Sequence, residues 1–139
     1  MATPQLPPYA VYPAEFAFRS IAQRAARLGI GGEREIALAT LQAARFAMAA
    51  LGPAALPKGQ RQARIVAARI WFGTLALPAR ARLAVQRVVD ASATDDRQAL
   101  AAGLEELIEV AAPVLDRAAS GELRTLLRFA ERGDHTATA

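Results

Sequence analysis

Glycine and proline divide this chain into segments in which apolar residues recur every three or four positions, the period of a helix packed on one face. No segment alternates apolar and polar residues as a half-buried strand does, and no internal repeat is evident. The pattern predicts an all-α fold, a compact bundle of five or six helices. The predicted helices span 13–28, 33–51, 58–77, 78 to a polar break at 92–96, that break to 119, and 122–132.

Three positions set the expected ends of the later helices. Ser92 or Thr94 is expected to cap the helix that follows the polar break. Pro113 is expected to kink that helix, because proline has no N–H to donate to the carbonyl of Glu109. Gly121 is expected to separate the last two helices.

The length of 139 residues fits one domain, predicted at residues 13–132. Residues 1–12 are rich in proline and predict an extended N-terminal arm, which Tyr9 and Tyr12 could anchor on the bundle or on a neighbouring subunit. Of these two, packing on its own bundle is favoured. Residues 133–139 are predicted to form a flexible tail.

The third predicted helix, 58–77, is apolar on nearly every side after its first two turns, with Arg69 as the exception. A helix apolar all round is buried, so its far end is expected in the middle of the domain. Trp71 is expected in the core, with base stacking as the alternative role. The side chains predicted to be buried are Ile65, Trp71, Phe72, Leu75, Leu104 and Leu107.

Between Glu35 and Asp90 the chain has no acidic residue, although eight cationic residues stand in those 54 positions. Cations without acids nearby in the sequence favour an external polyanion as partner. Three arginines are expected on the exposed face of the helix that begins at Pro78, and others at the start of the helix before it. The candidate nucleic-acid-binding residues are Lys58, Arg61, Arg64, Arg69, Arg80, Arg82 and Arg87.

The sequence offers little for catalysis. It has no cysteine, and its single histidine is His135 in the predicted tail, which leaves no zinc site of the His/Cys type and no nucleophile–histidine pair. Glu105, Glu106 and Glu109 are expected to form a solvated acidic face. We therefore expect a protein that is not an enzyme and holds no metal or cofactor. With no signal peptide and no apolar run long enough for a membrane span, a cytoplasmic location is expected.

Two functions fit these features. The first is a non-catalytic small helical subunit that binds nucleic-acid backbone, either RNA or single-stranded DNA, without reading sequence. If helix packing brought both cationic groups onto one surface, they would form a stripe of about six charges. The second is a protein–protein adaptor or self-assembling subunit without nucleic acid. It is supported by the charge division: residues 1–90 hold twelve cations and four acids, whereas residues 91–139 hold five cations and nine acids.

The two functions make different demands on the arginines. In the adaptor, they would pair with the acids of the helix that follows residue 96, or with the acidic half of another copy. In the nucleic-acid subunit, Arg61, Arg64, Arg80, Arg82 and Arg87 would remain available for phosphates.

In size, helical class and the placing of those five arginines, the chain resembles the small subunits (Cas11-type) of multi-subunit CRISPR effector complexes. The resemblance implies a ribonucleoprotein subunit that stacks along the complex and contacts guide RNA or target nucleic acid through its backbone. It also implies other protein subunits as partners.

Overall fold

The computed structural model describes residues 18–51, 57–94 and 96–132, which form six α-helices and no strand. The all-α bundle predicted from the helical periodicity is thus confirmed for this part of the chain. The predicted arm (1–12) and tail (133–139) lie outside the described residues. The helices are α1 Arg19–Arg27, α2 Gly32–Leu51, α3 Lys58–Gly73, α4 Ala79–Thr94, α5 Arg97–Ala111 and α6 Arg117–Arg132.

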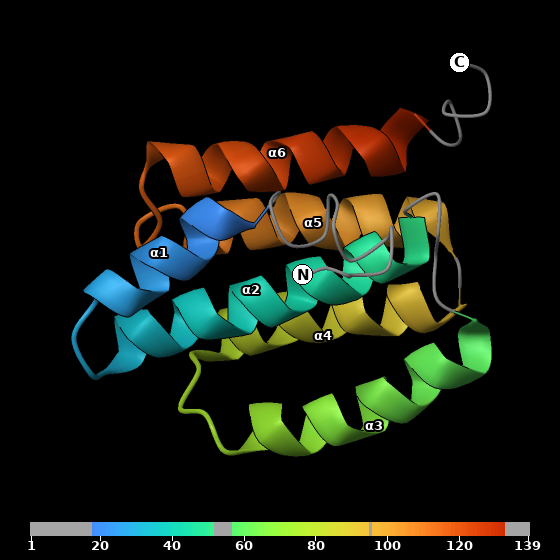
Figure 1. The fold of residues 1–139 in the computed structure, drawn as a ribbon, viewed down its shortest axis with the longest axis horizontal. Coiled ribbons are helices and arrows are strands. Elements are labelled where there is room, and N and C mark those ends of the chain that lie inside the picture. Colours follow the sequence, from blue (N-terminus) through green and yellow to red (C-terminus); the bar gives the residue numbers. More distant parts are fainter. Residues whose placement is uncertain (1–17, 52–56, 95, 133–139) are drawn as a thin grey trace, which may run out of the picture.

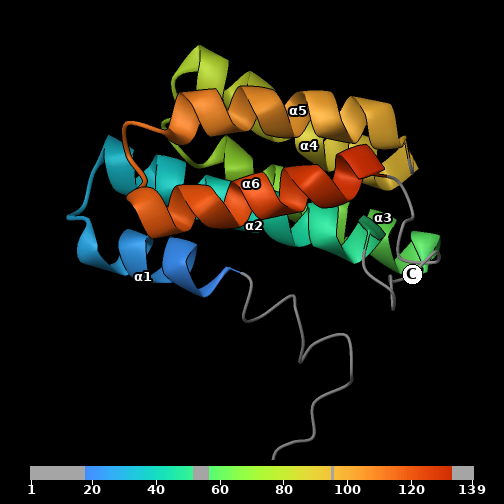
Figure 2. The ribbon, with the colours of Figure 1, turned by 90° about the horizontal axis from the view of Figure 1, so that it is seen from above.

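The central helix is α2, which packs against each of the other five helices. Figure 1 shows α3 at one edge of the bundle and α6 at the opposite edge, with α2 and α4 between them. Figure 2 shows α1 on the side of the bundle away from α5. No helix in the described part of the chain combines the length and apolarity that a membrane span requires.

Small residues allow the central helices to approach one another closely. The buried positions of α2 are mostly alanines, and α4 and α5 meet at Gly103. A Cβ atom built on Gly103 would lie 3.1 Å from Cγ2 of Val88 and 3.2 Å from its backbone nitrogen. The larger side chains of α5, among them Leu104 and Leu107, fill the remaining space and are fully buried, as predicted.

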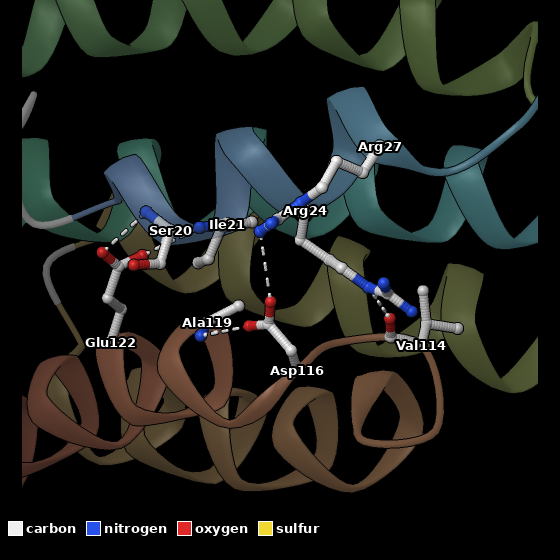
Figure 3. A network of polar contacts seen from close by, with 8 residues as sticks. All are labelled: Ser20, Ile21, Arg24, Arg27, Val114, Asp116, Ala119 and Glu122. Carbon is white, nitrogen blue, oxygen red and sulfur yellow. Dashed lines mark hydrogen bonds and ion pairs between the residues drawn. The ribbon is translucent and has the colours of Figure 1, made fainter.

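Polar contacts attach α1 to α6 and to the turn before it (Figure 3). The backbone N–H groups of Ser20 and Ile21 donate to the two carboxylate oxygens of Glu122, at 2.9 and 3.0 Å. Arg24 Nε donates to the carbonyl of Val114 at 2.8 Å. Because the first N–H groups of a helix have no partner within it, the carboxylate of Glu122 acts as a cap supplied by a distant helix.

Several of the predicted helix ends were wrong. α4 continues through Ser92 to Thr94, and the residue that caps α5 is Asp96, whose side chain accepts from the N–H of Ala99 at 3.0 Å. α5 ends at Ala111, so Pro113 ends the helix rather than kinking it. Asp116 then caps α6, accepting from the N–H of Ala119 at 2.9 Å, and Gly121 lies inside that helix.

The expected burial of the far end of α3 was also wrong. Ile65 and Phe72 are buried as predicted, but Trp71 and Leu75 are only partly buried. α3 ends at Gly73, four residues before its predicted end, with Thr74 as its C-cap. Glycine is unfavourable within a helix, and Leu77 is disfavoured in the α region because it precedes Pro78. The helix lies at the edge of the bundle and buries one side against α2 and α4, while the leucines and valines of the other helices supply the core.

Candidate functional site

Arg80, one of the predicted phosphate-binding residues, forms ion pairs with two acids of its own chain. Its Nε lies 3.1 Å from Oε2 of Glu106 and its Nη2 lies 2.9 Å from Oε1 of Glu109. The hydrogen bond to Glu106, the charge of that carboxylate and the second pair with Glu109 raise the pKa of the Arg80 guanidinium. The pairing with acids of the helix after residue 96, the alternative considered from the sequence, is therefore present at this residue.

Arg69 also forms an ion pair within the chain, with Asp90 of α4. Both side chains are more than half exposed, at 55 % and 58 %. An ion pair this open to water contributes little to stability, and salt weakens it further. Arg69 is thus paired, but exchanging Asp90 for another anion would cost little free energy.

Two further candidates bind backbone carbonyl groups. Arg61 is 5 % exposed, and its Nη1 donates to the carbonyl of Ser92 on α4. Arg82 is partly buried and donates to the carbonyls of Phe72 and Leu75, at 3.3 and 2.7 Å. The two carbonyls that Arg82 binds belong to the end of α3 and the turn after it, and that of Phe72 also accepts from the N–H of Leu75 at 3.1 Å. Both arginines therefore attach α3 to α4.

The remaining candidates are Lys58, Arg64 and Arg87. Lys58 is the first residue of α3, and its side chain lies outside the described part of the structure. Arg64 and Arg87 are exposed, and neither has an ion pair or hydrogen bond with another described residue. Arg87 lines a hollow between α4 and α5 that Asp90 also lines, whereas Arg64 faces α2. Of the six candidates whose side chains are described, four have partners within the chain, and Arg64 and Arg87 line different hollows, so these six do not form the single stripe considered from the sequence.

Positively charged side chains line a groove between α2 and α3. One part of it has a volume of about 240 Å³, and a neighbouring part has a volume of about 440 Å³. The two parts share Gln42, Phe46 and Arg64, so they form one continuous groove. Its remaining lining residues are Arg45 and Ala49 of α2 and Arg61, Ala67, Ala68 and Trp71 of α3.

The composition of the α2–α3 groove suits an anionic ligand with an aromatic part. Among the described residues, three arginines line it, Arg45, Arg61 and Arg64, and no acidic residue does. Arg61 is buried, and its guanidinium binds the carbonyl of Ser92, so the exposed charges of the groove are those of Arg45 and Arg64. Arg45 is exposed and, like Arg64, has no ion pair or hydrogen bond with another described residue. Arginine forks bind phosphate oxygens in pairs, while indole and phenyl rings offer faces for stacking.

Arg45 was missing from the residues predicted from sequence, although it belongs to the same acid-free stretch. α2 and α3 run antiparallel (Figure 1), so the end of α2 lies beside the start of α3. Gln42 and Arg45, like Arg61 and Arg64, are three positions apart and share a helix face. That shared spacing in two consecutive helices is the signal that would have identified the groove.

No group of three or more histidine, cysteine, aspartate or glutamate side chains within the described ranges is placed to hold a metal ion. The α2–α3 groove contains arginine, glutamine, alanine and two aromatic residues, which bind and stack but offer neither a nucleophile nor a general base. Comparison with protein-family models, curated proteins and solved structures found no match to this chain, so its function has to be inferred from the residues of the site.

Proposed function

We propose that this chain is a non-enzymatic helical subunit that binds the phosphate backbone of RNA or single-stranded DNA in the α2–α3 groove. The observation that carries the proposal is that the exposed arginines Arg45 and Arg64 converge on one groove, beside Arg61 in its wall, and that no acidic side chain among the described residues lines it. Trp71 lines the same groove, and an indole there gives an unpaired base a surface for stacking. A place in a ribonucleoprotein assembly, as the resemblance to Cas11-type subunits implies, is part of the proposal.

The groove offers fewer cationic side chains, and therefore a weaker attraction for phosphate, than the stripe of about six charges considered from the sequence. Arg69, Arg80 and Arg82 have partners within the chain, and Arg87 lines a separate hollow between α4 and α5. Arg45 and Arg64 are therefore the exposed arginines of the groove, with Arg61 at its wall. For a single strand, two or three neutralised phosphates give a log–log salt slope of about −1.5 to −2. We expect this slope for the intact chain.

The test is a fluorescence-anisotropy titration of labelled oligouridine and oligothymidine at two salt concentrations. Arg45→Gln and Arg64→Gln should each raise Kd by about threefold to tenfold and make the salt slope less steep by about 0.7. Arg124→Gln is the matched control, since Arg124 is an exposed arginine on α6 at the other edge of the bundle. Its Kd should stay within about twofold of the parent value.

Two results would overturn the proposal. One is the absence of oligonucleotide binding at low salt, and the other is an equal loss of affinity in the groove variants and the Arg124→Gln control. Equal affinity of both groove variants and the parent chain would likewise remove the groove from the binding site. A difference between oligouridine and oligothymidine would decide between RNA and DNA, since only the former carries 2′-hydroxyl groups.

A role in protein–protein contact is the second candidate function, and a separate observation favours it. Val66 and Ile70 of α3 are 58 % and 71 % exposed, although residues of their type are usually buried. Purifying the chain at low and then high salt and comparing the ratio of absorbance at 260 and 280 nm distinguishes the two functions. Retained nucleic acid at low salt supports the first function, and co-purifying protein without nucleic acid supports the second.

A further inference from the structure

Gln42 is the uncharged polar side chain in the middle of the α2–α3 groove. It is partly buried and lines both parts of the groove, as Phe46 and Arg64 do. Its side-chain amide has no hydrogen bond with another described residue. The arginines supply the donors that suit phosphate oxygens, so phosphate binding does not require this amide. Its donors and its acceptor are therefore available to another part of a bound nucleotide.

Trp71 lines the same part of the groove as Gln42. Its indole ring packs at a tilt on the buried ring of Phe72, with the two ring centroids 5.2 Å apart and the planes at 54°. A side chain that is already held in place loses little freedom when a ligand binds to it. A purine covers more of an indole ring than a pyrimidine does, so stacking on Trp71 favours a purine.

The amide of Gln42 distinguishes between the two purines. A glutamine side chain has an acceptor, its oxygen, beside two N–H donors. Adenine presents the complementary pair, the N6 donor beside the N7 acceptor, so glutamine can bind it through two hydrogen bonds. Guanine presents two acceptors on the same edge, O6 and N7, and one amide cannot satisfy both with its oxygen and its nitrogen.

The spacing of the lining residues allows phosphate and base contacts within one strand. Arg64 and Trp71 are seven positions apart on α3, so they lie on the same side of the helix, about 10 Å apart along its axis. Arg64 lines both parts of the groove, whereas Arg45 lines only the part away from Trp71. A single strand lying along the groove would therefore bring phosphates to the arginines and a base to Trp71 and Gln42.

We infer that Gln42 makes the α2–α3 groove selective for adenine in single-stranded RNA or DNA. The inference rests on the proposed binding of nucleic acid in this groove and adds a specificity-determining residue to it. The amide oxygen of Gln42 accepts from the N6 amino group and its N–H donates to N7, while the base stacks on Trp71. This contact departs, at one base, from the binding without sequence readout that the sequence alone led us to expect. The arginines bind phosphates of any sequence, so strands without adenine still bind, but more weakly.

The test uses the full chain and three labelled strands of about eight nucleotides, in fluorescence anisotropy at low salt. The first strand is all uridine. The second has adenosine at its centre, and the third has purine riboside there, which keeps the purine ring but lacks the N6 amino group. The adenosine strand should bind about fivefold to tenfold more tightly than the purine riboside strand, the low end of the discrimination that two hydrogen bonds to a base provide.

Gln42→Leu removes the amide and keeps a side chain of similar size. It should weaken binding of the adenosine strand to the level of the purine riboside strand, and change the Kd of the all-uridine strand by no more than about twofold. The matched control is Gln98→Leu, because Gln98 is an exposed glutamine on α5, outside the groove. This control should bind all three strands as the parent does, and both variants should keep the helical circular-dichroism signal.

Two outcomes would overturn the inference alone. One is equal affinity of the parent chain for the adenosine and purine riboside strands, and the other is an adenosine preference that survives in Gln42→Leu. In both cases binding of the all-uridine strand would still support phosphate binding in the groove. If none of the three strands binds at low salt, the proposed function fails, and selectivity for adenine fails with it.

Discussion

Replacing Glu122 with alanine tests how the first helix is held on the bundle. In the native structure the two oxygens of this carboxylate accept the N–H groups of Ser20 and Ile21 at the start of α1 (Figure 3). Loss of an N-cap acceptor costs about 0.5–2 kcal/mol, and hydrogen bonds to a charged group contribute about 1.5–3 kcal/mol when water is excluded. Glu122 is partly buried, so the low end of the second range applies and we expect a loss of about 2 kcal/mol.

The assay is urea and thermal unfolding followed by circular dichroism. For a chain of this length, 2 kcal/mol corresponds to a decrease in Tm of roughly 6–10 °C. Glu131→Ala is the control, because Glu131 is an exposed glutamate on the same helix with no ion pair or hydrogen bond to another described residue. Its effect should stay within about 0.5 kcal/mol. Equal effects of the two substitutions would refute the capping argument.

Two further substitutions test how α4 is packed. Gly103→Ala should lower the free energy of unfolding by about 1 kcal/mol, because crowding of the new methyl group against Val88 outweighs the better helix propensity of alanine. A variant that is more stable than the parent in urea would contradict this. Arg82→Ala should lower it by about 1–2 kcal/mol, since Arg82 donates to the carbonyl of Leu75, whereas Arg87→Ala should stay within about 0.5 kcal/mol. Similar results for the two arginines in the same denaturation assay would show that the carbonyl contacts contribute nothing measurable.

The helical core could be predicted from the sequence because its signals are local. α2 begins and ends within one residue of its predicted range, between a glycine pair and Gly52-Pro53. The burial of Leu104 and Leu107 follows from their three-residue spacing on a helix that packs on one side. These features depend only on neighbours in the chain.

The break between α5 and α6 could not be placed correctly from its residues because two signals competed. Pro113 and Gly121 both disfavour helix, and the prediction treated the proline as a kink and the glycine as the end. In a helix interior glycine costs about 1 kcal/mol and proline about 3 kcal/mol relative to alanine, which favours the break at Pro113. Asp116, placed three residues before Ala119, supplies the cap that starts α6.

The prediction that the far end of α3 is buried was wrong for a different reason. The alanines and glycines of α3 made the helix appear apolar on all sides, but each of them buries little apolar area and so contributes little to deciding which side faces the bundle. Which side faces the bundle is decided by the larger side chains Ile65 and Phe72, which lie on one face. The opposite side, with Val66 and Ile70, is left exposed, and only the arrangement of the other helices determines that.

A stretch without acids in the sequence need not lack them in space. Arg80 meets Glu106 and Glu109 across 26 and 29 positions of chain, and Arg69 meets Asp90 across 21. The fold thus pairs Arg80 of α4 and Arg69 of α3 with acids and leaves Arg45, Arg64 and Arg87 exposed, with no ion pair to another described residue.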